Sequence, residues 1–314
     1  MTDAFVCDRG RIDMSRVINY VKEIAEKYQN IGFEGIVVLD IEGRTQYEKR
    51  WIQDYPRDIY SNTKSFTGAA VGMAIYQNKI LLDTAVTELF GLEKCTPMWN
   101  KMRLRDLLTM RSGFSREHLM YFDRRRGIGS ENYLDYLFAQ EVTFEPGSHY
   151  IYSTGDTILA GCMVERAVGM SLHAYLYENL FLPLNIDYPI WESDLSGHTC
   201  GGSGLQLKLV DMAKLGCVYL NDGYLNNVRF FNSSWTNLSF IEYVPLNEKK
   251  YPESYGFFWR ICNNGQFYKA TGSFGQDTLI IPNEKCVLGY QCREGTDTNL
   301  IRDILQKELF EKLI

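Results

Sequence analysis

Ser61 and Lys64 are three residues apart in the segment RDIYSNTKSFTGAAVGMAIY, which covers positions 57 to 76. The small and apolar residues that follow them predict a buried helix that starts near Ser61. On such a helix the two side chains lie one turn apart on the same face, so the amine can reach the hydroxyl. A buried lysine can act as a base toward a serine nucleophile, because desolvation disfavours its ammonium form. The alternative is that Ser61 is only the polar first residue of the helix.

The start of that helix would supply a second catalytic feature. The first backbone N–H groups of a helix have no partner within it, so they can face the negative charge that develops on an attacked carbonyl oxygen. About one Ser-x-x-Lys match is nevertheless expected by chance in a chain of this composition. The pair therefore indicates an enzyme only together with further motifs.

Composition and charge limit the possible functions. The chain has 314 residues, of which 45% are hydrophobic, and this is enough for one large domain or two closely packed ones. A formal charge of -6 gives no broad positive field, so we expect no nucleic-acid partner. No run of eighteen apolar residues occurs, and the start MTDAFVCDRGRIDMSR lacks a signal-peptide pattern. These features predict a cytoplasmic protein without a membrane partner, unless an export signal has been trimmed away.

The eight cysteines are scattered, with no Cys-x-x-Cys pair and no His at ligand spacing. We expect most of them to be free core thiols in a reducing compartment, and we expect no metal and no cofactor. They are Cys7, Cys95, Cys162, Cys200, Cys217, Cys262, Cys286 and Cys292.

Hydrophobic periodicity predicts the order of the elements. A first helix follows a possible Asp13 cap, and residues from about 33 to 51 predict a strand hairpin. Residues 81–209 have a mainly helical pattern, short strands follow from about 251, and a last helix ends the chain. The apolar positions are Met14, Val17, Ile18, Val21, Ile24 and Ala25 in the first helix, and Leu300, Ile301, Ile304, Leu305, Leu309 and Phe310 in the last.

This order predicts two structural units. Residues 1–80 and 210–314 would form one discontinuous α/β sheet domain, and residues 81–209 would form an inserted helical domain. The active site would lie in the cleft between them.

Several segments resemble one known family, in the same order. SNTKSFTGAAVGMAI is similar to the nucleophile helix of the serine β-lactamase and penicillin-binding-protein superfamily, in particular its class C β-lactamase and esterase branch. LRDLLTMRSGF, FEPGSHYIYSTGDTILAGCMVERAVG, GGSGLQLKLVDMAKLGCVYL, YGFFWRI and ATGSFGQDTLIIP continue the resemblance. It implies an α+β, β-lactamase-like fold, in which N- and C-terminal helices flank an antiparallel sheet and a mainly helical lobe is inserted. It also implies that Ser61 is the nucleophile and Lys64 its partner.

The resemblance implies a second motif, Tyr-x-Asn, on a loop of the helical lobe. The matching residues are Tyr152-Ser153-Thr154, directly before a predicted helix. Tyr152 beside a cationic Lys64 would have a lowered phenol pKa and could exchange protons with Ser61 and the leaving group. Tyr150 is the competing candidate, two residues earlier. The two titrating groups would form one coupled unit.

The third motif of the family departs from its usual Lys-Thr-Gly or His-x-Gly pattern. A variant that ends Ala-x-Gly-x-x-Gly-Gln, as in the branch that resembles 6-aminohexanoate-dimer hydrolases, fits Ala270, Gly272, Gly275 and Gln276, with a register that could move by two or three residues. On this alignment, the backbone N–H groups of Ser61 and Ala270 form the oxyanion hole. Thr154, Gly272, Ser273 and Gln276 are the candidate substrate-binding residues.

These departures bear on the substrate. The family's Asn and Lys, which help to hold a β-lactam, are replaced here by Thr154 and by no obvious cation. We therefore predict a serine hydrolase that forms an acyl-enzyme on a small ester or amide. The alternatives are a β-lactamase or D-alanyl-D-alanine peptidase and, from another class, a non-catalytic binding protein on the same fold. The sequence does not determine the oligomeric state.

Two further segments could reach the cleft. Gly201-Gly202-Ser203-Gly204 predicts a tight backbone turn that lines it. Asp123-Arg124-Arg125-Arg126-Gly127 predicts a solvated basic loop, or alternatively an Arg that selects an anionic substrate.

Overall fold

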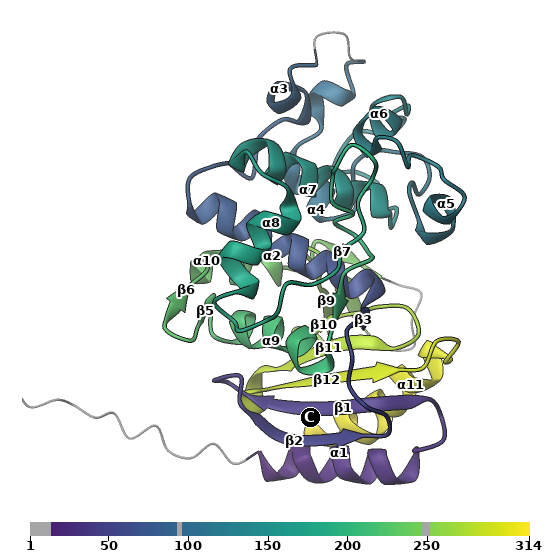
Figure 1. The fold of residues 1–314 in the computed structure, drawn as a ribbon, viewed down its shortest axis with the longest axis vertical. Helices are drawn as coiled ribbons and strands as arrows, with labels where there is room; N and C mark the ends of the chain where they lie inside the picture. Colours follow the sequence, from purple (N-terminus) through teal and green to yellow (C-terminus); the bar gives the residue numbers. More distant parts are fainter. Residues whose placement is uncertain (1–13, 93–95, 247–251) are drawn as a thin grey trace, which may run out of the picture.

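An eight-stranded antiparallel sheet forms the lower half of the molecule in the computed structural model, which describes residues 14–92, 96–246 and 252–314 (Figure 1). The strand order is β2-β1-β12-β11-β10-β9-β8-β7. The N- and C-terminal parts of the chain share this sheet, because β1 pairs with β12 from Phe33 opposite Cys292 to Asp40 opposite Cys286. The strands are β1 (Phe33–Asp40), β2 (Thr45–Arg50), β7 (Val244–Pro245), β8 (Glu253–Tyr255), β9 (Arg260–Cys262), β10 (Phe267–Ala270), β11 (Gln276–Ile281) and β12 (Cys286–Cys292).

Helices cover both faces of the sheet. Helix α1 (Ser15–Lys27) and the C-terminal helices α11 (Thr298–Leu305), η5 (Gln306–Phe310) and α12 (Glu311–Leu313) lie on one face, and α9 (Leu209–Leu220) lies on the other. In β1, Ile36 and Val38 join the hydrophobic core with α1, whereas Val37 and Leu39 join the core on the α9 side. The strand is therefore apolar along its whole length because both of its faces are buried.

The predicted terminal helices are present, with two differences. The proposed cap Asp13 lies outside the described residues, and α1 begins at Ser15. Leu300 was expected on the buried face of the last helix, but it is 46% exposed, whereas Ile301 and Ile304 are buried. It precedes the apolar stripe by one residue and so lies on the solvent side of α11.

The upper half is built around two buried helices, α2 (Thr63–Tyr76) and α7 (Thr154–Val168), which pack against each other. Small residues allow this close packing. At Gly161 on α7, for example, a Cβ atom would lie 3.7 Å from Thr67 Cγ2 on α2, in ordinary van der Waals contact. The α-helix was expected to start near Ser61, but Ser61 belongs to a 3-10 turn, η1 (Tyr60–Asn62), that leads into α2.

The segment between α2 and α9 is mainly helical, as expected. It contains α3 (Val86–Phe90), η2 (Trp99–Lys101), α4 (Leu104–Leu108), α5 (Tyr121–Arg125), α6 (Tyr133–Phe138), α8 (Leu172–Leu176) and η3 (Tyr177–Phe181). A two-residue strand, β4 (Gln206–Leu207), pairs with β3 (Arg57–Asp58) and so joins this segment to the turn before Ser61. The boundaries of the two predicted domains stay a prediction. The α+β fold itself is confirmed.

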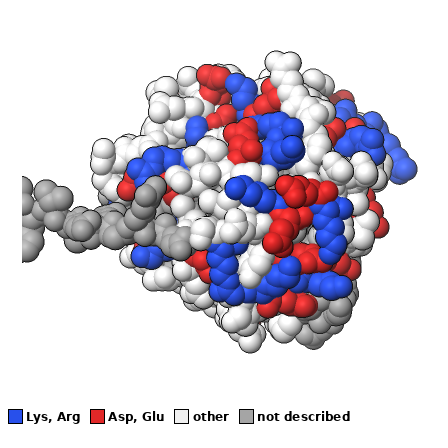
Figure 2. All heavy atoms as spheres, turned by 90° about the horizontal axis from the view of Figure 1, so that it is seen from below, with Lys and Arg blue, Asp and Glu red and all other residues white. Residues whose placement is uncertain are grey.

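Charged side chains of both signs are mixed on the face around α1, which Figure 2 shows from below. Lys27, for example, lies 2.7 Å from Glu308, and Lys312 lies 3.1 Å from the same carboxylate. Within the described ranges, none of the helices is both long and apolar enough to cross a membrane.

Candidate active site

The turn that carries Ser61 is fixed by the residues immediately before it. Tyr60 has a φ of +48°, a strained conformation for a residue with a side chain. The Asp58 carboxylate holds this turn, because its Oδ1 accepts hydrogen bonds from the backbone N–H of Tyr60 at 2.6 Å and of Gly204 at 3.2 Å. Asp58 thus joins the Ser61 turn to the glycine-rich turn at residues 201–204.

Lys64 points back from the first turn of α2 toward Ser61. Its side-chain nitrogen Nζ lies 3.3 Å from Ser61 Oγ, 3.3 Å from Thr154 Oγ1 and 2.8 Å from the backbone oxygen of Gly202. The side chain is only 1% exposed, and this burial lowers the pKa of Lys64 below its ordinary value. The glycine-rich turn that was expected to line the cleft thus contacts the lysine through Gly202.

Tyr152 lies on the other side of Lys64, just before α7. Its ring centroid is 5.0 Å from Lys64 Nζ, and its hydroxyl interacts with the side chains of Ser61 and Lys64. Burial by itself raises the pKa of Tyr152, but the positive charge of Lys64 and the hydrogen bond with Ser61 outweigh this effect, so the phenol pKa is lowered. Tyr152, which is far from Ser61 and Lys64 in the chain, is therefore brought together with them.

Two neighbouring contacts hold the loop of Tyr152 in place. The backbone N–H of Ile151 donates to the carbonyl of Met110 at 2.9 Å, and the N–H of Gly155 donates to the carbonyl of His118 at 2.8 Å. Thr154 is buried against Lys64, and its hydroxyl donates to Met120 Sδ at 3.4 Å. Thr154 thus contacts the lysine and is not among the residues that line the cleft.

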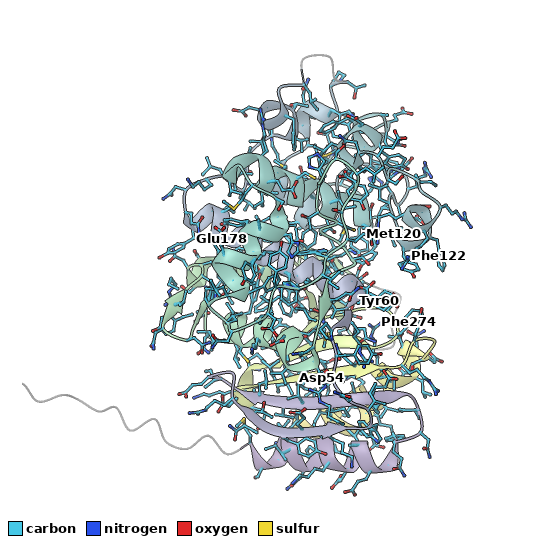
Figure 3. The ribbon with its side chains drawn as sticks, viewed as in Figure 1. Asp54, Tyr60, Met120, Phe122, Glu178 and Phe274 are labelled. Carbon is cyan, nitrogen blue, oxygen red and sulfur yellow. The ribbon has the colours of Figure 1, made fainter. Side chains whose placement is uncertain are left out.

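A cleft of about 490 Å³ opens at Ser61 and Tyr152. Its wall also contains Phe274, whose ring lies 5.3 Å from that of Tyr60, and the Tyr60 ring lies 6.0 Å from that of Tyr121 on α5. Figure 3 shows Tyr60 and Phe274 together, with Met120 and the 72% exposed Phe122 above them. Aromatic side chains thus border the opening beside Ser61.

The third-motif residues lie along one side of this cleft. Gly272 and Ser273 line it, whereas Ala270 is buried at the end of β10 and is followed by the lining residue Thr271. The side chain of Gln276 is turned away, because its amide donates to the carbonyl of Cys292 at 2.8 Å. The oxyanion role of Ala270 and the substrate-binding roles of Gly272, Ser273, Thr154 and Gln276 stay predictions.

A buried carboxylate, Asp277, holds the loop that contains Gly272. It accepts a hydrogen bond from the Gly272 N–H at 2.9 Å and one from the Tyr290 hydroxyl at 2.6 Å. Arg302 on α11 donates to both of its oxygens, at 2.9 and 3.0 Å. The Gly272 N–H is therefore already used by the protein.

No obvious cation was expected in the cleft, and Arg260 corrects this expectation. It is the first residue of β9, it lines the cleft with Ser61 and Tyr152, and its charge helps to lower the pKa of Tyr152. Its guanidinium lies 3.3 Å from the Glu253 carboxylate. Only its place in the YGFFWRI segment could have indicated this residue, because its neighbours in the site come from distant parts of the chain.

Arg124 also differs from the expectation of a solvated basic loop. It is 9% exposed, its Nε donates to Glu192 Oε1 at 2.8 Å, and Nη2 contacts the second carboxylate oxygen at 3.3 Å. This ion pair fastens α5 to the segment that leads to the Gly202 turn. Arg124 is therefore a structural cation rather than an exposed one.

The chain is similar to several known proteins. A family model described as Beta-lactamase matches residues 20–298. A Salmonella typhimurium protein provisionally described as a D-alanyl-D-alanine carboxypeptidase is 23% identical over 72% of the chain. The match spans 66% of that protein's length, so the chain covers just under two thirds of the curated relative.

Solved structures show the same fold. One, provisionally described as a 6-aminohexanoate-dimer hydrolase from Bacillus anthracis, has a TM-score of 0.76 and 23% identity over 93% of this chain and 81% of its own. The octameric penicillin-binding protein homologue from Pyrococcus abyssi has a TM-score of 0.73 and 19% identity over 94% of this chain and 77% of its own. With the family match over residues 20–298, these findings show that the chain belongs to the beta-lactamase family, within the superfamily of serine β-lactamases and penicillin-binding proteins.

Proposed function

We propose that this member of the beta-lactamase family hydrolyses a small ester or amide through an acyl-enzyme on Ser61, with Lys64 and Tyr152 as its proton-transfer groups. One observation carries the proposal: Ser61 Oγ borders an open cleft and lies 3.3 Å from the nitrogen of a buried lysine. Among the residues that the structure describes, the polar contacts of Lys64 are to hydroxyls and a carbonyl and not to a carboxylate. A lysine buried in this way favours its neutral form, and a neutral amine can accept the proton of a serine hydroxyl.

The contacts of Lys64 fit this role. In the neutral amine, two N–H bonds can be donated to the Gly202 carbonyl and to Thr154 Oγ1, and the lone pair then faces Ser61 Oγ. Ser61 Oγ attacks the substrate carbonyl carbon, and its proton passes to the pair formed by Lys64 and Tyr152. The same proton is then delivered to the leaving oxygen or nitrogen, and water releases the acyl group by the reverse sequence.

Tyr152 is the more suitable group for the second proton transfer. Its hydroxyl contacts Ser61, and the ring borders the cleft where a leaving group would lie. The lowered pKa of the phenol brings it closer to neutral pH, where exchange of the proton is most effective. The two groups titrate as one coupled unit, so the base is the pair and not either residue alone.

The oxyanion would be held by backbone N–H groups at Ser61 and at the end of β10. We assign the second donor to Ala270, as the family resemblance implies, with Thr271 as the neighbour that borders the cleft. Gly272 cannot supply it without a rearrangement, because its N–H donates to Asp277. Each such donor contributes on the order of 10²-fold or more to the rate in other hydrolases.

A second candidate activity is a D-alanyl-D-alanine carboxypeptidase. Arg260 favours it, because a guanidinium beside the nucleophile can bind a substrate carboxylate. The name of the Salmonella relative also favours it. The pairing of Arg260 with Glu253 weakens the argument, since part of its charge is already balanced. We therefore rank the ester or small-amide substrate first.

The test begins with a fluorophosphonate probe, which reacts with activated serine nucleophiles. Wild type should be labelled, and Ser61→Ala should not be labelled, with Ser273→Ala as the matched control because it removes a hydroxyl that also borders the cleft. Absence of labelling in the wild type would instead favour a non-catalytic binding protein on this fold.

The second stage compares substrates on the same two proteins. p-Nitrophenyl esters, D-alanyl-D-alanine peptides and a chromogenic cephalosporin are assayed against wild type and Ser61→Ala. Ester turnover that depends on Ser61 supports the first candidate, and faster release of D-alanine supports the second. Turnover that persists in Ser61→Ala would refute both.

A further inference from the structure

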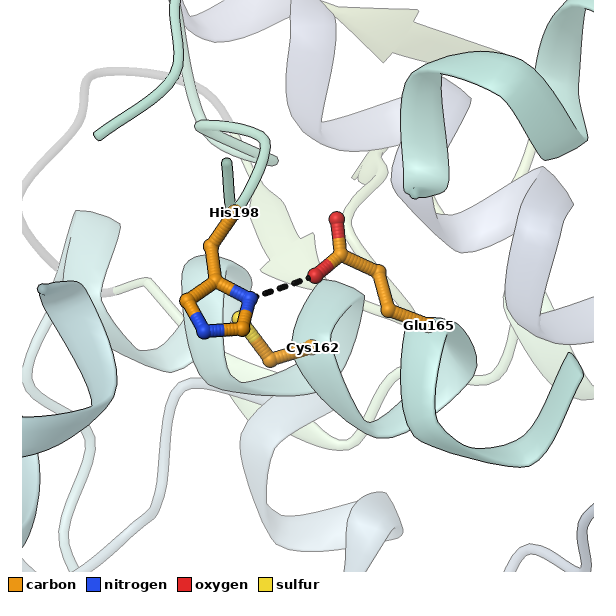
Figure 4. A group of neighbouring side chains, drawn as sticks. All are labelled: Cys162, Glu165 and His198. Carbon is orange, nitrogen blue, oxygen red and sulfur yellow. Dashed lines mark hydrogen bonds and ion pairs between the residues drawn. The ribbon is translucent and has the colours of Figure 1, made fainter. Parts of the chain in front are cut away.

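A second group of reactive side chains lies outside the cleft, on the opposite part of α7. Cys162 and Glu165 are three residues apart on this helix and so lie on one face, and His198 reaches them from a loop (Figure 4). The possible ligand atoms of the three residues all lie within 4.8 Å of one another. Cys162 and His198 are 36 positions apart in the sequence, so their spacing gives no sign of a shared site.

The carboxylate of Glu165 is held in one orientation. Its Oε1 accepts hydrogen bonds from the backbone N–H groups of Leu172 at 2.9 Å and Thr199 at 3.1 Å. Its Oε2 therefore faces the remaining two side chains and lies 2.9 Å from His198 Nδ1. Hydrogen bonds that fix one oxygen and leave the other free are typical of the support around metal-binding carboxylates.

The cysteine does not fit a second nucleophilic site. Cys162 is 1% exposed, so a substrate could not reach its sulfur atom. A thiol next to a fixed carboxylate and an imidazole has another use. Zn²⁺ in proteins is bound by Cys, His and carboxylate side chains, and direct coordination removes the thiol proton.

The surroundings give a cation access to these three side chains and leave room for a fourth ligand. A cavity of about 460 Å³ is lined by all three residues, and the His198 side chain is 27% exposed. Tetrahedral Zn²⁺ with ordinary bond lengths needs ligand atoms roughly 3.3 to 3.6 Å apart. The present separations, from 2.9 Å to at most 4.8 Å, bracket this range, so side-chain adjustments of about an ångström would complete the geometry.

We propose that Cys162, Glu165 and His198 bind one divalent cation of the Zn²⁺ type, with water from the cavity as the fourth ligand. A thiolate, a carboxylate and a neutral imidazole balance the two positive charges of the cation. The alternative is a purely structural role, in which Glu165 and His198 form only an ion pair that holds the loop against α7. The cation would fasten the same loop, which continues through Thr199 and Cys200 to the Gly202 carbonyl that accepts from Lys64.

The test uses the full chain after treatment with a chelator. Zn²⁺ is titrated in competition with a chromophoric chelator, and Co²⁺ is used as a spectroscopic probe, since a cobalt–thiolate bond gives a charge-transfer absorption in the near ultraviolet. Wild type should bind one equivalent and show this absorption. Cys162→Ala should lose the absorption, and both Cys162→Ala and His198→Gln should weaken binding at least tenfold.

The matched controls are Cys217→Ala and His149→Ala. Cys217 is a buried thiol on α9, and His149 is an exposed imidazole stacked on Phe144. Both controls, and Ser61→Ala, should bind the cation as wild type does. His198→Gln replaces a partly exposed side chain and should fold normally. It therefore still tests the proposal if Cys162→Ala does not fold. Binding that is absent in wild type, or unchanged in His198→Gln, would overturn the proposal.

Discussion

Asp156 is a buried carboxyl group in the first turn of α7, four residues after Tyr152, and its ionisation should make stability depend on pH. It is completely buried, and its partners are the Ser112 hydroxyl at 2.9 Å and the Ser112 N–H at 3.4 Å. Burial raises the pKa of Asp156 from 3.8 to about 7, although the bonds from Ser112 oppose the shift.

The sign follows from proton binding. Between pH 3.8 and about 7 the folded protein holds a proton on Asp156 that the unfolded chain has lost, so the free energy of unfolding falls as pH rises through this window. Above it, ionised Asp156 costs the fold about 4 kcal/mol, at roughly 1.4 kcal/mol for each pH unit between the two pKa values. About 3 kcal/mol of this cost develops between pH 5 and pH 8.5.

Asp156→Asn removes the ionisation and keeps an oxygen that can accept from Ser112. Relative to wild type, the variant should therefore gain about 3 kcal/mol of stability at pH 8.5 compared with pH 5. Thermal unfolding at the two pH values measures this as a difference of several degrees in the unfolding midpoint. Asp303→Asn, on the exposed side of α11, is the control and should show no such difference. Equal effects of Asp156→Asn at both pH values would refute the reasoning.

Three further predictions concern the cleft. Lys64→Met should lower kcat for ester hydrolysis by about 10² to 10⁴-fold. In wild type, kcat/KM should rise with pH at values below the ordinary lysine pKa, because burial lowers the pKa of Lys64. A flat pH profile would contradict the role of Lys64 in proton transfer. Asp58→Ala should lower kcat by about tenfold or more, because the N–H groups of Tyr60 and Gly204 lose their acceptor. Asp58→Asn keeps an acceptor oxygen and should restore most of the rate. If it does not, the negative charge of Asp58 is required and the acceptor alone is not enough. Phe274→Ala should lower kcat/KM for benzoate esters by about tenfold more than for acetate esters, and an equal loss for both would remove this aromatic wall from substrate recognition.

The sequence predicted the helices and strands whose pattern is set by residues close together in the chain. The hairpin expected over residues 33–51 occurs as β1 and β2, and the apolar spacing of the first helix is that of α1. The pairing of Phe33 with Cys292 was not readable from periodicity, because it joins the two ends of the chain. The order of the predicted elements indicated only that the N- and C-terminal segments share one sheet, and it determined neither the strand order nor the register.

In the candidate site, too, contacts between residues close in sequence were predictable, and contacts between distant segments were not. Ser61 and Lys64 lie one turn apart, so their spacing alone places the amine near the hydroxyl. Tyr152 came from the resemblance, because nothing in its local pattern specifies that α7 packs against α2. Arg260 was missed, because a lone arginine in a short strand carries no spacing signal. Cys162 and His198 were missed for the same reason, since a loop brings them together across the fold.

The burial of Lys64 ties these distant segments into one unit. A lysine that is removed from water needs partners, and its partners here come from the η1 turn, from α7 and from the Gly202 turn. The space around it is full, because a Cβ atom at Gly202 would lie 2.7 Å from Thr154 Cγ2 and 3.2 Å from Lys64 Nζ. The carbonyl that accepts from the amine can approach this closely only from a glycine. The protonation of Lys64, and with it the reactivity proposed for Ser61, is therefore set by packing between segments that the sequence keeps far apart.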